Sequence, residues 1–164
     1  MTIIAALHGP QAARRRLRQR RGATLVEAAL VLPMLLLFFI GVTEYGRYLM
    51  TNDIFNIAAK EGAAYAAKHT DPIVLGGTTY GNGTSDVTNV VNSFLGGLTL
   101  SGQSTQVYMS DSLGNNLGTW TNATAGQYVC VKITGTYTFA ANALLFLPSS
   151  VPLTFQSVVL CEGN

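Results

Sequence analysis

The feature that most constrains this chain is an abrupt change of composition between residues 14 and 43. A block of six arginines in eight residues is followed by Gly22, one acid at Glu27, and then sixteen residues without a charge. As a helix, residues 28–43 span about 24 Å, and a start at Ala23 extends this to about 31 Å, which matches the ~30 Å hydrocarbon core of a bilayer. We therefore expect a membrane-spanning helix over residues 23–43.

That assignment places Glu27 at the edge of the bilayer. A carboxylate at the edge of a bilayer is costly, so it needs either a partner or a function. Glu27 is therefore the first candidate functional residue. The alternative is a side chain that merely extends to the lipid headgroups.

The arginine block predicts how the helix is oriented. Cationic residues beside an apolar segment stay on the cytoplasmic side, so the C-terminal part of the chain is exported. Nucleic-acid binding is the weaker interpretation, because the block directly adjoins the apolar run. The six arginines of residues 1–22 carry +6 and the remainder of the chain −4, which gives the net +2. These residues are Arg14, Arg15, Arg16, Arg18, Arg20 and Arg21.

The helix is expected to continue beyond the membrane. Residues 44–70 contain many alanines and no proline, and Asp71-Pro72 ends the run. One face carries Asn52, Asp53, Asn56 and Lys60, and another carries Ile54, Ile57, Ala58 and Tyr65. Pro33 should kink or locally unwind the membrane half, because its ring excludes the usual backbone bond. No small-x-small cleavage site directly follows the apolar run, so the anchor stays attached.

The exported part, residues 71–164, is predicted to be a small α+β head. A loop over 76–85 precedes a short helix from Ser85 or Asp86 to about Leu95. A period of two then predicts strands at 106–110, 117–121, 128–139 and 153–161, joined between the last two by a buried-looking run at 144–147. Three or four antiparallel strands need an apolar partner, and the amphipathic half of the long helix supplies it.

The two cysteines, Cys130 and Cys161, both fall in the exported head. Export to an oxidising compartment predicts a disulfide between them. The alternative is a pair of buried thiols.

We find no sequence support for catalysis or for a cofactor. The two histidines lack metal-ligand spacing, and no nucleophile elbow or phosphate-binding loop occurs. Asp71, Asp86 and Asp111 are scattered and leave a calcium site open only as a minor alternative. We expect neither an enzyme nor a metal protein.

One stretch resembles a known family. Arg20-Arg-Gly22, then Ala-Thr-Leu-Val-Glu27 and a long apolar helix, look like the signal of type IV-like prepilins. The run Ala28-Ala-Leu-Val-Leu-Pro33 and the later Gly41-Val-Thr-Glu-Tyr-Gly-Arg47 resemble the TadE-like minor pilins of the tight-adherence (Tad) system. The resemblance implies that a prepilin peptidase cuts between Gly22 and Ala23, and that residues 1–22 are a leader.

Two departures from the small major pilins of that system favour a minor component. Ala28 stands where those pilins usually carry tyrosine, and the 142 residues after Gly22 exceed their length. The expected function is thus a structural minor pilin (pseudopilin), with other pilin subunits and the Tad assembly platform as partners in the inner membrane. The head would be periplasmic, or extracellular in a pilus. The alternative is an uncleaved, signal-anchored envelope protein whose exported β domain binds a ligand or surface.

Overall fold

The computed structural model describes the backbone of residues 11–70, 73–75, 78–80 and 83–162, and the side chains of residues 24–70 and 83–162. The first ten residues of the predicted leader lie outside the described residues. The chain divides into two compact units between Val42 and Thr43. Helix α1 (Gln11–Lys68) contributes to both units, and the sheet and the remaining helices belong to the second.

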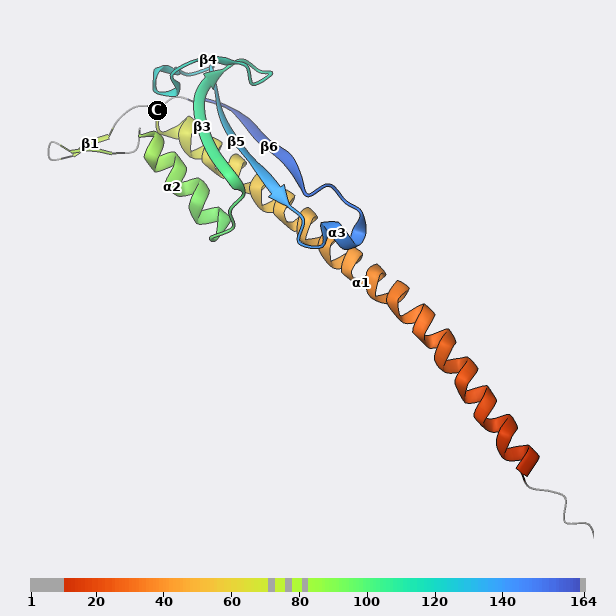
Figure 1. Ribbon diagram of the computed structural model, residues 1–164. Helices are drawn as coiled ribbons and strands as arrows, with labels where there is room; N and C mark the ends of the chain where they lie inside the picture. Colours follow the sequence, from red (N-terminus) through yellow and green to blue (C-terminus); the bar gives the residue numbers. More distant parts are fainter. Residues whose placement is uncertain (1–10, 71–72, 76–77, 81–82, 163–164) are drawn as a thin grey trace, which may run out of the picture. The chain divides into compact units, whose positions relative to one another are not determined.

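The second unit is built on a four-stranded antiparallel sheet with the order β4-β3-β5-β6 (Figure 1). Its strands are β3 (Ser101–Ser110), β4 (Asn116–Gly118), β5 (Tyr128–Thr138) and β6 (Ser150–Leu160). The central strand β5 and the edge strand β6 pair along their whole length, from Tyr128 opposite Leu160 to Thr138 opposite Ser150. The predicted α+β class, with a long helix against an antiparallel sheet, is confirmed.

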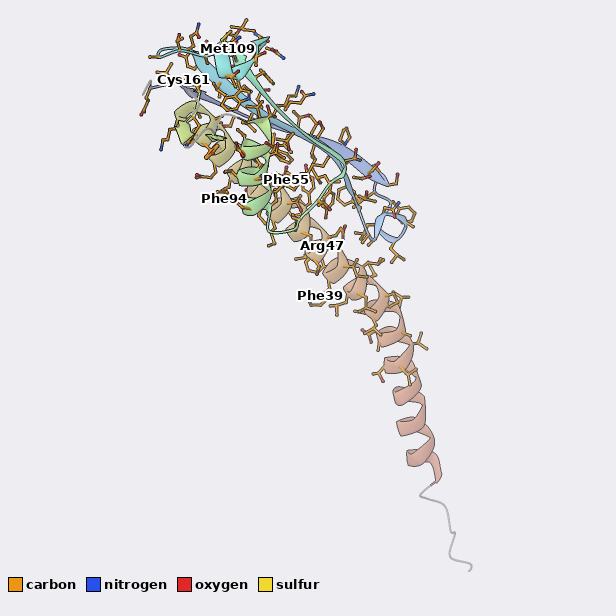
Figure 2. The ribbon with its side chains drawn as sticks, turned by 90° about the vertical axis from the view of Figure 1, so that its left-hand side faces the viewer. Phe39, Arg47, Phe55, Phe94, Met109 and Cys161 are labelled. Carbon is orange, nitrogen blue, oxygen red and sulfur yellow. The ribbon has the colours of Figure 1, made fainter. Side chains whose placement is uncertain are left out.

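The head half of α1 and helix α2 (Thr84–Leu95) cover one face of this sheet. Phe55 of α1, labelled in Figure 2, stacks on Phe155 of β6 with ring centroids 5.2 Å apart. Small side chains let the helix approach the strands closely. At Gly62 an added Cβ would come within 2.6 Å of Val91 in α2 and 3.6 Å of Val131 in β5, so only glycine fits there. The buried α1 residues are Phe55, Ala58, Ala59, Ala63, Ala66 and Ala67.

The buried face of α1 differs partly from the predicted one. Ala58 is buried as expected, but Ile57 is half exposed, and the core is centred on Phe55, Ala59 and Ala63. The size of the α1 side chains explains the difference. The sheet approaches α1 where alanines are densest rather than where the largest aliphatic residues lie. Asp53, Asn56 and Lys60 are exposed, as predicted.

Several predicted boundaries were wrong. Part of the predicted 76–85 loop forms a strand, β2 (Thr78–Tyr80), which pairs with β1 (Ile73–Leu75). Strand β3 begins at Ser101, and its register shifts between Ser101 and Ser104 to accommodate Gly102 at a positive φ. The predicted strand 117–121 is a three-residue β4 followed by a 3-10 turn, η1 (Trp120–Asn122), which buries Trp120. Gly118, at φ 139°, ends the strand.

The run 144–147, predicted to be buried, is exposed instead. It belongs to the connection between β5 and β6 and contains the single-turn helix α3 (Asn142–Leu145). Leu144 and Phe146 project away from the core, so this crossover does not add to it.

Candidate assembly helix and its junction with the head

The first unit presents an almost fully exposed apolar helix surface. Residues from Leu25 to Val42 include exposed leucine, valine, methionine and phenylalanine side chains. The helix is long and apolar enough to cross a membrane, and none of its most apolar window is buried. Such a surface is unfavourable in water, and lipid or another apolar helix is the environment that suits it. The helix continues through Pro33 without interruption.

The predicted processing and topology residues all lie on α1. The six leader arginines, Gly22 and Ala23 are helical, but their side chains lie outside those described. Glu27 is exposed on the same helix. Among the side chains described, the one ion pair joins Glu44 and Arg47, so Glu27 has no cationic partner within this part of the chain.

Glu44 is a functional candidate that sequence analysis missed. The residue is only 5% exposed. One oxygen, Oε1, accepts a hydrogen bond from the Ala140 backbone N–H at 2.9 Å, and the other, Oε2, lies 3.5 Å from Nη1 of Arg47. Ala140 directly precedes the α3 crossover. Glu44 therefore ties that crossover to the first turn of α1 beyond the apolar run. Two sequence signals pointed to it: it is the first charge after that run, and it lies three residues before Arg47.

An aromatic cluster surrounds this junction. Tyr48 of α1 meets Tyr137 edge-on at 5.5 Å and stacks on Phe139 at 6.0 Å, and the latter two rings are 5.0 Å apart. The Tyr137 hydroxyl is buried without a hydrogen-bond partner. Burial raises the pKa of Tyr137, the Glu44 carboxylate adds to the rise, and the Arg47 guanidinium opposes it. The hydroxyl is therefore neutral.

The predicted disulfide between Cys130 and Cys161 is wrong. Both cysteines are free and buried. Val129 and Val131 belong to the core under the helices, so Cys130 between them points to the opposite face of the sheet. Cys161 belongs to the helix-side core. Cys130 also pairs with Val158, three residues before Cys161 along the chain. Strand alternation and register together keep the two sulfurs apart.

Each thiol lies in a separate protected environment. Burial raises the pKa of both cysteines, and at Cys130 hydrogen bonds with Tyr108 and Gln156 oppose the rise. The turn after β3 covers this outer face, because Tyr108 Oη and Gln156 Nε2 both donate to the Gly114 carbonyl, at 3.2 Å and 2.9 Å. A raised pKa leaves little thiolate, so both cysteines are poorly reactive in the folded head.

The aspartates considered for calcium have other roles where they are described. Asp111 organises the turn after β3, accepting bonds from the backbone N–H groups of Leu113 and Asn115 and from the Asn115 side chain. These bonds lower the pKa of Asp111. Asp86 accepts a bond from the Gly83 N–H at the start of α2, and Asp71 lies outside the described residues. In the described part of the chain, no three potential ligands gather in a metal-binding group.

The family comparison falls on the same helix. Residues 22–64 match the family model described as TadE-like protein. This confirms the resemblance predicted from sequence for that segment. The match begins at Gly22 and ends within the buried half of α1, so the TadE-like segment covers both the exposed apolar surface and the Glu44 junction. No curated protein and no solved structure matches the chain significantly.

Proposed function

We propose that this protein is a structural minor pilin (pseudopilin) of a Tad-type pilus. A prepilin peptidase processes it after Gly22, and it assembles through α1 to support pilus biogenesis and surface adherence. The observation that carries the proposal is the exposed apolar surface of residues 25–42, interrupted at its start by a single acid, Glu27, within a TadE-like segment. A helix of this kind needs a bilayer before assembly and neighbouring helices afterwards.

Processing would change the charge of the N-terminus completely. Hydrolysis adds water across the Gly22–Ala23 peptide bond, leaving a carboxylate on the leader and a new amine on Ala23. The leader takes all six arginines with it, and the remaining side chains carry a formal charge of −4. Until then, the arginines hold the leader in the cytoplasm and direct the head to the periplasm. After the cut, the six arginines no longer oppose extraction of α1 from the membrane.

The new amine provides a partner for Glu27. Ammonium and carboxylate groups at the bilayer edge are each poorly solvated, and pairing compensates both. Ala23 and Glu27 lie four residues apart on one helix, so an amine can be paired within its own chain or with a neighbour. A pair between neighbouring subunits would set the axial register of one helix against the next. We assign Glu27 this role in assembly, with the prepilin peptidase, other pilins and the Tad platform as partners.

Intact-mass measurement of the membrane-extracted protein tests the proposal. In cells with an active Tad system, the mature chain should begin at Ala23, and Gly22→Val should leave the full-length precursor because a side chain then blocks the cut. Gly46→Val is the matched control, since an added Cβ at Gly46 meets nothing within 4 Å and processing should be unchanged. Wild-type protein that retains its arginine leader at steady state would rule out the pilin assignment.

A second candidate function rests on a hollow in the head. An open cavity of about 380 Å³ is lined by Arg47, Met50, Thr51, residues 97–101 and 136–138. The guanidinium of Arg47, whose side chain is largely exposed, is a polar group suited to a small anionic ligand. An uncleaved, signal-anchored envelope protein with a ligand-binding head would use this cavity. The same mass measurement separates the two, because that protein keeps residues 1–22.

A further inference from the structure

The crossover between β5 and β6 exposes large apolar side chains without any charge nearby in sequence. Leu144 and Leu147 are substantially exposed, and Phe146 is 95% exposed. No charged residue occurs between Lys132 and Glu162. Residues 144–147, here called the apolar crossover, thus form a compact apolar projection. Nothing of the described chain packs against its tip.

The backbone of the crossover is strained to hold this projection. Phe146 has φ 53° and ψ 31°, and it is the one non-glycine residue with a positive φ among those described. Glycine normally occupies this position after a helix, because a Cβ is disfavoured there. The Leu147 N–H donates to the Asn142 carbonyl at 3.1 Å and closes the turn. The Phe146 ring is not buried, so no packing within the described chain offsets the backbone strain. This indicates a contact with something outside the chain.

The crossover lies beside the start of the head half of α1. The Ala140 N–H donates to Glu44, and Figure 1 shows α3 next to this part of α1. Glu44 follows Val42, the last of the exposed apolar residues of the first unit, by only two positions. Tyr45, which is largely exposed, follows directly, and tyrosine at such a position is typical of a membrane–water interface.

We propose that the apolar crossover is a second membrane contact, with Leu144, Phe146 and Leu147 inserted into the interfacial layer of the bilayer where α1 leaves it. Lipid fits better than a protein partner because the projection is exposed and uncharged, and because it begins four residues after Ala140, which is hydrogen-bonded to Glu44 just beyond the apolar run. The inference rests on the membrane-spanning part of the proposed function and is independent of cleavage and pilus assembly.

Lipid quenching of a site-specific fluorophore tests this contact. The full-length chain is reconstituted at one copy per nanodisc in a mixture of phosphatidylethanolamine and phosphatidylglycerol. An environment-sensitive label is attached to the Phe146→Cys variant, and the two native cysteines do not interfere because both are buried. Lipids brominated near the headgroup end of their chains should quench this label at least twofold more than a label on the Leu113→Cys control.

Leu113 is a matched control because it is apolar, 82% exposed and distant from the crossover. It follows β3, whose Ser110 lies opposite Tyr128 at one end of β5, whereas the crossover follows Thr138 at the other end. Eleven residues of strand separate the two ends by about 33 Å. Equal quenching at both sites would overturn the proposal.

A third label, on Leu30→Cys in the apolar part of α1, separates failure of the contact from failure of the span. Quenching at 30 but not at 146 would refute the crossover contact and leave the proposed function standing. No quenching at 30 would refute the membrane span and the contact together. Protection of the 146 label that appears only with several chains per nanodisc would assign the crossover to a subunit interface, which also overturns the proposal.

Discussion

The two halves of α1 are one helix in two environments. From Leu25 to Val42 the large aliphatic and aromatic side chains are exposed all around the helix, whereas from Phe55 to Ala67 small residues are buried on one face. Large side chains in the first half maximise apolar area for lipid or neighbouring helices. Alanine and Gly62 in the second half let a sheet and a second helix approach closely. The identity of the covering partner, rather than helix propensity, separates them.

Glu27 in the first half of α1 and Glu44 in the second half differ in the same way. Glu44 is buried and has its partners within the head, namely the Ala140 N–H and Arg47. Glu27 is exposed on a helix with no described cation beside it. A satisfied buried acid stabilises a fold, and an unsatisfied acid at a membrane edge needs a partner from elsewhere. The comparison therefore separates a residue that stabilises the head from the residue that we propose acts in assembly.

A matched pair of phenylalanines gives the largest expected difference between the halves. Phe55→Ala empties a fully buried site and should lower the free energy of unfolding of the head by about 3–5 kcal/mol. Phe38→Ala, at a side chain 67% exposed, should change it by less than about 0.5 kcal/mol. Urea titration of the full chain in detergent, followed by fluorescence of the single buried tryptophan, Trp120, measures both. If the two variants lose similar free energy of unfolding, the distinction between an exposed first half and a buried second half of α1 is wrong.

The Glu44 junction should have the next largest effect. Glu44→Ala leaves the Ala140 N–H without its acceptor and should cost about 1–3 kcal/mol in the same titration. Glu44→Gln retains a side-chain oxygen for that bond, so it should recover most of the loss. If glutamine is as destabilising as alanine, the stabilising contact is the ion pair with Arg47 rather than the hydrogen bond.

The assembly residue should behave in the opposite way. Glu27→Ala should leave the stability of the head and the amount of inserted protein unchanged, since it removes a costly charge from the membrane segment. Incorporation into sheared pili or assembly complexes should fall about tenfold, equivalent to about 1.4 kcal/mol. Glu61→Ala, at an exposed acid in the second half of the same helix, is the control. Normal incorporation of the Glu27 variant would refute the pairing role.

The smallest effect concerns the strained crossover. Phe146→Gly relieves a positive φ but adds freedom to the unfolded chain, so the head should gain roughly 0.5 kcal/mol. Phe146→Ala keeps a Cβ at the same φ and should show no such gain. A loss of stability in the glycine variant would mean that the ring packs on the head, contrary to its exposure.

Local patterns in the sequence were sufficient for much of this structure. The apolar run, the lone acid and the TadE-like motif depend on residues close together in the chain, and the period of two identified the long strands 128–138 and 150–160 to within a few residues. Helical spacing also placed Asp53, Asn56 and Lys60 correctly on an exposed face of α1. Such features are visible in sequence because neighbouring residues determine them.

Only the tertiary structure decided which distant residues meet. The bond between Glu44 and Ala140 joins positions 96 residues apart. Whether Cys130 and Cys161 pair depends on strand parity and register, since a shift of one residue exchanges the two faces of a strand. Leu144 and Phe146 were expected to be buried because they are apolar, but burial requires a partner surface. The sheet's helix-covered face was already filled by α1 and α2, which left the crossover exposed.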